Sequence, residues 1–174
     1  MTTMTPPVRK FALTAHVTSS VGWLGAVAAF LALAVAGLTS QDPQVVRAAY
    51  LAMELTAWFV IVPLSLASLV TGLVQSLGTT WGLFRHYWVL IKLLMTILAT
   101  LALLVHMRPI SYMARVAATT TIARADHRGV RIQLVATAGA ALLVLLVATT
   151  LGVFKPRGIT PYGRRKQNDQ RTSP

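Results

Sequence analysis

The chain has 174 residues, of which 55% are hydrophobic and only 11% are charged, whereas soluble globular domains carry about 25% charged residues; water is therefore not its main solvent. The absence of cysteine excludes disulfides, thiolate metal sites and cysteine nucleophiles. The net charge of +12 comes from basic residues that flank apolar segments, where they meet anionic headgroups, so we expect membrane lipids and not nucleic acid as partners.

The first predicted helix covers residues 11–38, between the basic pair Arg9 and Lys10 and the polar segment 39–43. A cleaved signal peptide is the alternative, because the basic pair, the apolar segment and the small residues at 34–36 imitate its three regions. The length of the segment and early polar residues such as His16 disfavour that alternative. Small residues at Gly22 and Gly25 predict close helix packing.

Three further apolar segments follow, at about residues 48–77, 87–107 and 132–154. At about 1.5 Å per residue, each segment is long enough for a hydrocarbon core of about 30 Å. Pro63 in the second segment predicts a kink that frees a backbone carbonyl. The fold class is therefore all-α, an integral membrane four-helix transmembrane bundle over residues 1–157. Residues 158–174 read as a basic, disordered cytoplasmic tail.

Four spans place both termini on one side of the membrane. The flanks of the termini and the second loop hold eight Lys and Arg residues, against six on the other side. The positive-inside rule then predicts a multi-pass protein of the cytoplasmic membrane with both termini in the cytoplasm.

The third connection, residues 108–131, is the one long predicted loop. Apolar residues recur at helical intervals within it, which predicts a short amphipathic helix over residues 109–118 lying on the outer surface. We expect its arginines to contact anionic lipid, and recognition of an anionic ligand or partner is the alternative. These arginines are Arg108, Arg115, Arg124, Arg128 and Arg131.

Ionisable residues inside the spans mark possible sites, because burying charge in a bilayer is costly. Counted from the predicted cytoplasmic end, His16 and Lys92 reach a similar depth and are expected to face each other. Glu54 lies about 10 Å deep in the second predicted helix, counted from the opposite side of the membrane. Two polar layers follow, separated by an apolar midplane containing Trp23. The inner layer holds His16, Ser19, Ser20, Lys92 and His86, and the outer layer holds Glu54, His106, Arg131 and Gln133. The plainer alternative is that Lys92 snorkels and that His86 and His106 are interfacial residues without a ligand.

The segment from His16 to Gly25 places a histidine seven residues before Trp-x-Gly. In this it resembles an uncharacterised, actinobacterial-type family of four-span membrane proteins, which is similar to the copper resistance D-like membrane proteins. The segment 85–88 is similar as well. The resemblance implies that His16 binds haem or copper. Copper is the less favoured metal, because methionine-rich and repeated histidine clusters are missing from the sequence.

Three functions are compatible with these residues. The first is a redox component that holds one b-type haem between His16 and His86, with His106 as a further candidate metal ligand and His127 as its imaginable partner for a second haem. The second is a proton- or ion-coupled transporter acting as a dimer through Glu54, Lys92 and His16. The third is a non-catalytic membrane subunit that docks a partner through the third loop and the tail. No hydrolase or transferase motif is found in the sequence.

Overall fold

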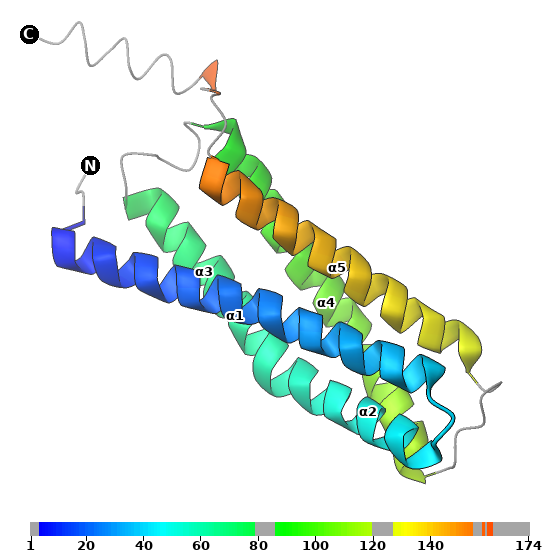
Figure 1. Ribbon diagram of the computed structural model, residues 1–174. Helices are drawn as coiled ribbons and strands as arrows, with labels where there is room; N and C mark the ends of the chain where they lie inside the picture. The colour runs from blue at the N-terminus through cyan, green and yellow to red at the C-terminus, as the bar shows by residue number, and fades with distance from the viewer. Residues whose placement is uncertain (1–3, 79–85, 120–126, 155–157, 159, 162–174) are drawn as a thin grey trace, which may run out of the picture.

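The computed structural model describes residues 4–78, 86–119, 127–154, 158, 160 and 161. Four long helical segments form one bundle (Figure 1). They are α1 (Pro6–Thr39), the composite second segment α2 (Pro43–Thr56), η1 (Ala57–Ile61) and α3 (Val62–Gly78), then α4 (Tyr87–Thr119) and α5 (Arg128–Phe154). All four are long and apolar enough to cross a membrane. The predicted all-α four-helix bundle of a multi-pass membrane protein is confirmed.

The bundle has two distinct ends. The start of α1, the end of α3, the start of α4 and the end of α5 lie together at what we call the terminal end (Figure 1). The other end, called the far end, holds the connection from α1 to α2. That connection is short because Asp42 caps α2, its carboxylate accepting a hydrogen bond from the backbone N–H of Gln44 at 2.8 Å, and Pro43 starts the helix at a position where no N–H is needed.

A π-helical turn lies just before Pro63, where a kink was expected. Residues Ala57–Ile61 form η1, in which the backbone N–H of Val62 donates to the carbonyl of Ala57. A proline inside an α-helix clashes with the carbonyl four residues earlier, here Phe59. The wider turn just before Pro63 relieves this clash, so the second span runs on from α2 into α3.

Helix α4 is longer than the predicted third span, and the prediction of a separate surface helix over residues 109–118 was wrong. These residues continue α4 through Pro109 to Thr119. The continuation buries Ile110, Met113 and Ala117 in the main apolar core, and α4 packs against α2. This burial offsets the hydrogen bond that Pro109 removes. Since α5 begins at Arg128, the connection after α4 is shorter than the predicted loop 108–131.

The apolar core is concentrated toward the far end. Large buried side chains such as Phe30, Tyr50 and Met113 fill that part of the bundle. Toward the terminal end, the buried residues of α1 and α3 are small or polar, among them Ala12, Ser19 and Ser68. The helices also diverge toward the terminal end in Figure 1. The bundle is thus tightly packed in one half and loosely filled in the other.

Of the two glycines on α1 that were expected to pack closely, Gly22 does and Gly25 does not. A Cβ at Gly22 would meet the side chain of Leu64 at 3.2 Å, so this glycine packs against α3. A Cβ at Gly25 would meet nothing within 4 Å. The tightest glycine contact on α1 is instead at Gly37, where a Cβ would lie 2.9 Å from Cζ of Tyr50.

Candidate functional site: a basic cavity at the terminal end

A cavity of about 500 Å³ lies between α1, α3 and α4, with the last turn of α5 at its edge. This volume is within the range of small-molecule sites, about 300–1,000 Å³. We call it the basic cavity, since its lining contains two cationic side chains and a histidine, and none of the described residues that line it is Asp or Glu. Its polar lining residues are Arg9, His16, Ser68, Gln75, Ser76, Lys92 and Thr96, and its apolar ones include Leu13, Val17, Leu69, Trp88, Val89 and Leu93.

Two glycines shape the space around the charged groups. A Cβ at Gly72 on α3 would lie 3.0 Å from Cε1 of His16. A Cβ at Gly152 on α5 would lie 2.9 Å from Nζ of Lys92. The imidazole and the ammonium group therefore occupy positions that larger residues on the facing helices would fill.

The hydrogen bonds around His16 define its tautomer. Its Nδ1 lies 3.1 Å from Oγ1 of Thr71, and the Thr71 hydroxyl donates to the carbonyl of Ala67 at 2.6 Å. Because a hydroxyl has one proton to donate, the Thr71 oxygen accepts from Nδ1–H of His16. With the proton on Nδ1, Nε2 of His16 carries the lone pair. The imidazole can act there as a base or as a metal ligand.

A polar seam joins α1 to α3 beside the cavity. The hydroxyl groups of Ser20 on α1 and Ser68 on α3 are 2.8 Å apart, while Ser19 donates to the carbonyl of His16 within α1 at 3.1 Å. Hydrogen bonds between membrane helices contribute about 0.6 kcal/mol on average. The hydrogen bond between Ser20 and Ser68 therefore adds little free energy, but it sets how α1 and α3 pack next to His16.

Lys92 and Arg9 bring positive charge to the same space. Lys92 is half-buried on α4 and lines the cavity together with His16. In the described part of the chain, neither basic side chain makes an ion pair. Sequence reasoning treated Arg9 only as an interfacial charge, and it identified neither Thr71 nor Gln75. The signal for these residues is their spacing from Ser68 on one face of α3.

His86, the predicted second haem ligand, is not among the residues that line the basic cavity. It lies just before α4, with its ring centroid 6.4 Å from that of Trp88. Only Trp88 of this pair reaches the cavity lining. The two histidines of the predicted axial pair, His16 and His86, therefore do not line the same cavity.

The predicted outer polar layer does not form one cluster. Nδ1 of His106 bonds the carbonyl of Ala102 at 2.8 Å, and its Nε2 lies 3.3 Å from the hydroxyl of Thr137. Gln133 is exposed, and half-buried Glu54 makes no ion pair with any described residue. Among the described residues there is also no group of three or more His, Asp or Glu that could hold a metal ion.

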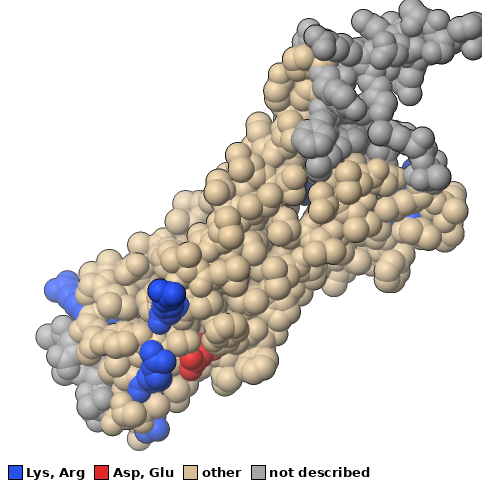
Figure 2. All heavy atoms as spheres, turned by 180° about the vertical axis from the view of Figure 1, so that it is seen from behind, with Lys and Arg blue, Asp and Glu red and all other residues tan. Residues whose placement is uncertain are grey.

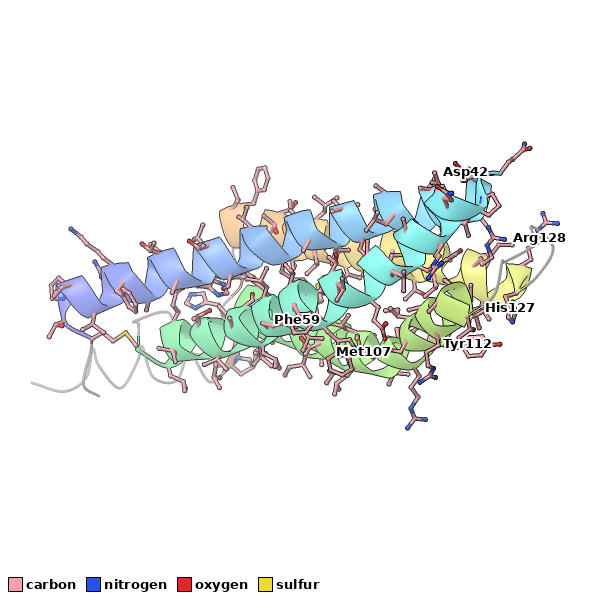
Figure 3. The ribbon with its side chains drawn as sticks, turned by 90° about the horizontal axis from the view of Figure 1, so that it is seen from below. Asp42, Phe59, Met107, Tyr112, His127 and Arg128 are labelled. Carbon is pink, nitrogen blue, oxygen red and sulfur yellow. The ribbon has the colours of Figure 1, made fainter. Side chains whose placement is uncertain are left out.

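His127 does not pair with His106 but lies against Tyr112, with ring centroids 5.6 Å apart. Figure 3 shows Tyr112, His127 and Arg128 at the same end of the bundle as Asp42.

Arg131 corrects the prediction that all the loop arginines contact lipid or an anion. It is 1% exposed. Its Nε donates to the hydroxyl of Tyr50 at 3.0 Å, and its Nη2 donates to the carbonyls of Gly37 and Leu38. These carbonyls belong to the last turn of α1, where the helix carries partial negative charge. The guanidinium therefore fastens α5 to the end of α1.

The other predicted arginines differ from Arg131. Arg108, Arg115 and Arg128 are exposed, and basic side chains gather at the far end on the face shown in Figure 2. Arg124 lies outside the described residues.

The predicted tail is described only at its start. The carbonyl of Gly158 accepts a hydrogen bond from the backbone N–H of Tyr87, and Thr160 is buried. Residues 162–174 lie outside the described part of the chain.

No protein-family model, no curated protein and no solved structure matches this chain. The resemblance to a four-span family therefore stays a prediction, and the function has to be argued from the cavity itself.

Proposed function

We propose that this membrane protein binds an anionic amphiphile in the basic cavity. The observation that carries the proposal is the lining: Arg9, His16 and Lys92 meet there among apolar side chains, and no carboxylate occurs among the described lining residues. A cation within a membrane span is costly unless an opposite charge or water compensates it. A ligand with an anionic head supplies that charge, and the apolar lining suits its body.

The cavity orients such a ligand. Its head fits between Lys92 and Arg9, where hydrogen bonds to charged groups are worth about 1.5–3 kcal/mol each. Its apolar body fits along residues such as Leu13 and Leu93. Ser76 and Gln75 add further polar groups to the lining.

A matched pair of lysine substitutions tests the proposal. The probe is a dansyl-labelled fatty acid, titrated into the purified protein in neutral detergent. Lys92→Met should weaken binding about tenfold, which corresponds to about 1.4 kcal/mol. Lys10→Met removes the same charge from an exposed position on α1 outside the cavity lining and should leave the affinity unchanged. Equal affinities for the wild type and Lys92→Met, or equal losses in both variants, contradict the proposal.

Haem binding is the second candidate, and the orientation of His16 favours it. Histidines that bind metals usually donate their other ring N–H to an acceptor, and a donation from Nδ1 of His16 to Thr71 leaves the lone pair on Nε2. Arg9 and Lys92, which both line the cavity, would supply positive charge for the carboxylates of a haem. When bound, haem supplies one-electron redox chemistry. The chain's own contribution would be one nitrogen ligand from His16, since His86 does not line the cavity.

An absorption spectrum separates the two candidates. Protein produced with haem available should show a Soret band if haem binds, and His16→Ala should remove that band. His127→Ala, which changes an exposed histidine beside Tyr112, should keep it. A colourless wild-type protein that still binds the fatty-acid probe excludes haem and leaves the first proposal standing.

We also propose that the protein lies in the cytoplasmic membrane with its terminal end in the cytoplasm. The excess of Lys and Arg in the segments flanking that side supports this orientation. The absence of natural cysteine permits a clean test with single cysteines at Thr5 and Gln41, both exposed and at opposite ends of α1. In intact cells a membrane-impermeant maleimide should label Gln41→Cys and not Thr5→Cys. The reverse pattern contradicts the orientation.

A further inference from the structure

The outward face of α4 changes its chemistry toward the far end. Leu98, Leu101 and Val105 on this face are 56%, 54% and 67% exposed. Beyond them, the same face carries two basic residues on either side of an aromatic one, Arg108, Tyr112 and Arg115.

The sequence spacing places these residues in one line. From Leu98 through Arg115 the steps along the chain alternate between three and four residues, which keeps side chains on one face of a helix. The opposite face of the same segment is buried, with Met107, Ile110 and Met113 in the core. The exposed line is therefore a surface of the bundle and not a part of its packing.

The dimensions of this line match those of one lipid. Half of a hydrocarbon core is about 15 Å thick, or about ten residues of helix, which is the distance from Leu98 to Arg108. An acyl chain lying along the apolar part thus brings its headgroup to Arg108 and Arg115. Neither arginine makes an ion pair with a described residue, and Tyr112, 40% exposed, is typical of the interface between membrane and water.

We propose that Leu98, Leu101, Val105, Arg108, Tyr112 and Arg115 form a binding site for one anionic phospholipid in the leaflet at the far end. The acyl chain follows the apolar residues, and the phosphate lies between the two guanidinium groups. This site is at the opposite end of the bundle from the basic cavity and does not depend on the proposed function.

The test measures lipid binding by native mass spectrometry, with phosphatidylglycerol and phosphatidylcholine added at equal concentrations. The wild type should prefer phosphatidylglycerol, and the double variant Arg108→Gln/Arg115→Gln should bind it about thirty-fold more weakly. The double variant Arg108→Lys/Arg115→Lys, which keeps both charges, should retain most of the binding. The control Lys10→Gln/Arg47→Gln removes two exposed charges from α1 and α2 and should behave as the wild type.

Three results overturn the proposal. The first is equal phosphatidylglycerol binding by the wild type and Arg108→Gln/Arg115→Gln. The second is full displacement of the lipid by equimolar glycerol 3-phosphate, which identifies a site for a soluble phosphate. The third is a protein dimer that is lost in the glutamine double variant, which identifies a second copy of the chain as the occupant. Measuring the Lys92→Met variant alongside separates this lipid from any ligand in the basic cavity.

Discussion

Replacing Gly37 by alanine should destabilise the bundle at its far end. The new Cβ would lie 2.9 Å from Cζ and 3.1 Å from the hydroxyl oxygen of Tyr50, and both distances are too short for unstrained contact. Tyr50 has little room to move, because it is 1% exposed and accepts a hydrogen bond from Arg131. Inserting a methyl group into a well-packed core costs about 1–3 kcal/mol.

The control is Gly25→Ala on the same helix, where the added Cβ meets nothing within 4 Å. Alanine in place of glycine favours a helix by up to about 1 kcal/mol, and the control measures this gain without the clash. We expect Gly37→Ala to be less stable than Gly25→Ala by about 1–3 kcal/mol in reversible unfolding of the purified protein in mixed micelles. Equal stability of the two variants refutes the close packing of Gly37, Tyr50 and Arg131.

Three further outcomes follow. Tyr50→Phe removes the acceptor for Nε of Arg131 and should lower the free energy of unfolding by about 1–3 kcal/mol; an unchanged value in the same unfolding assay contradicts the hydrogen bond. Gly72→Ala should displace the ring of His16, 3.0 Å from the added Cβ, and weaken binding of the dansyl fatty acid about tenfold, whereas unaltered affinity places the ligand away from His16. Asp42→Ala removes the cap of α2 and should cost about 1 kcal/mol, measured by thermal unfolding, and a variant as stable as the wild type argues against the cap.

The main features of the fold could be predicted because apolar segments of this length have few alternatives in a membrane. Backbone polar groups must be satisfied inside each segment, so each becomes a helix. The ends of the helices were harder to predict. Pro109 predicted the end of the third helix, yet α4 continues beyond it because Ile110 and Met113 are buried in the core. Such a position depends on where α2 lies, which local sequence does not determine.

The same limit applies to the sites. His16 and Lys92 could be selected as intramembrane polar residues by their depth alone, and both line the basic cavity. The role of Arg131 could not be predicted, because its partners are the last carbonyls of α1 and the hydroxyl of Tyr50. These groups are distant in sequence and meet only when the helices pack. Arg9 was missed for a similar reason, since only the neighbouring helices turn an interfacial charge into part of a cavity.

The asymmetry of the bundle connects the fold to the proposed function. Toward the far end, buried large side chains and the bonds of Arg131 hold the helices together. Toward the terminal end, small residues such as Gly72 and Gly152 leave the space that Lys92 and His16 border. A tightly packed half thus adjoins a half that has room for a ligand.

The most direct test of the central claim is to identify the small molecules that co-purify with the protein. The measurement is mass spectrometry of the small molecules extracted from purified wild type, Lys92→Met and Lys10→Met. We expect an acidic amphiphile that accompanies the wild type and Lys10→Met and is strongly depleted in Lys92→Met. Identical extracts from all three proteins would contradict a ligand held by the basic cavity.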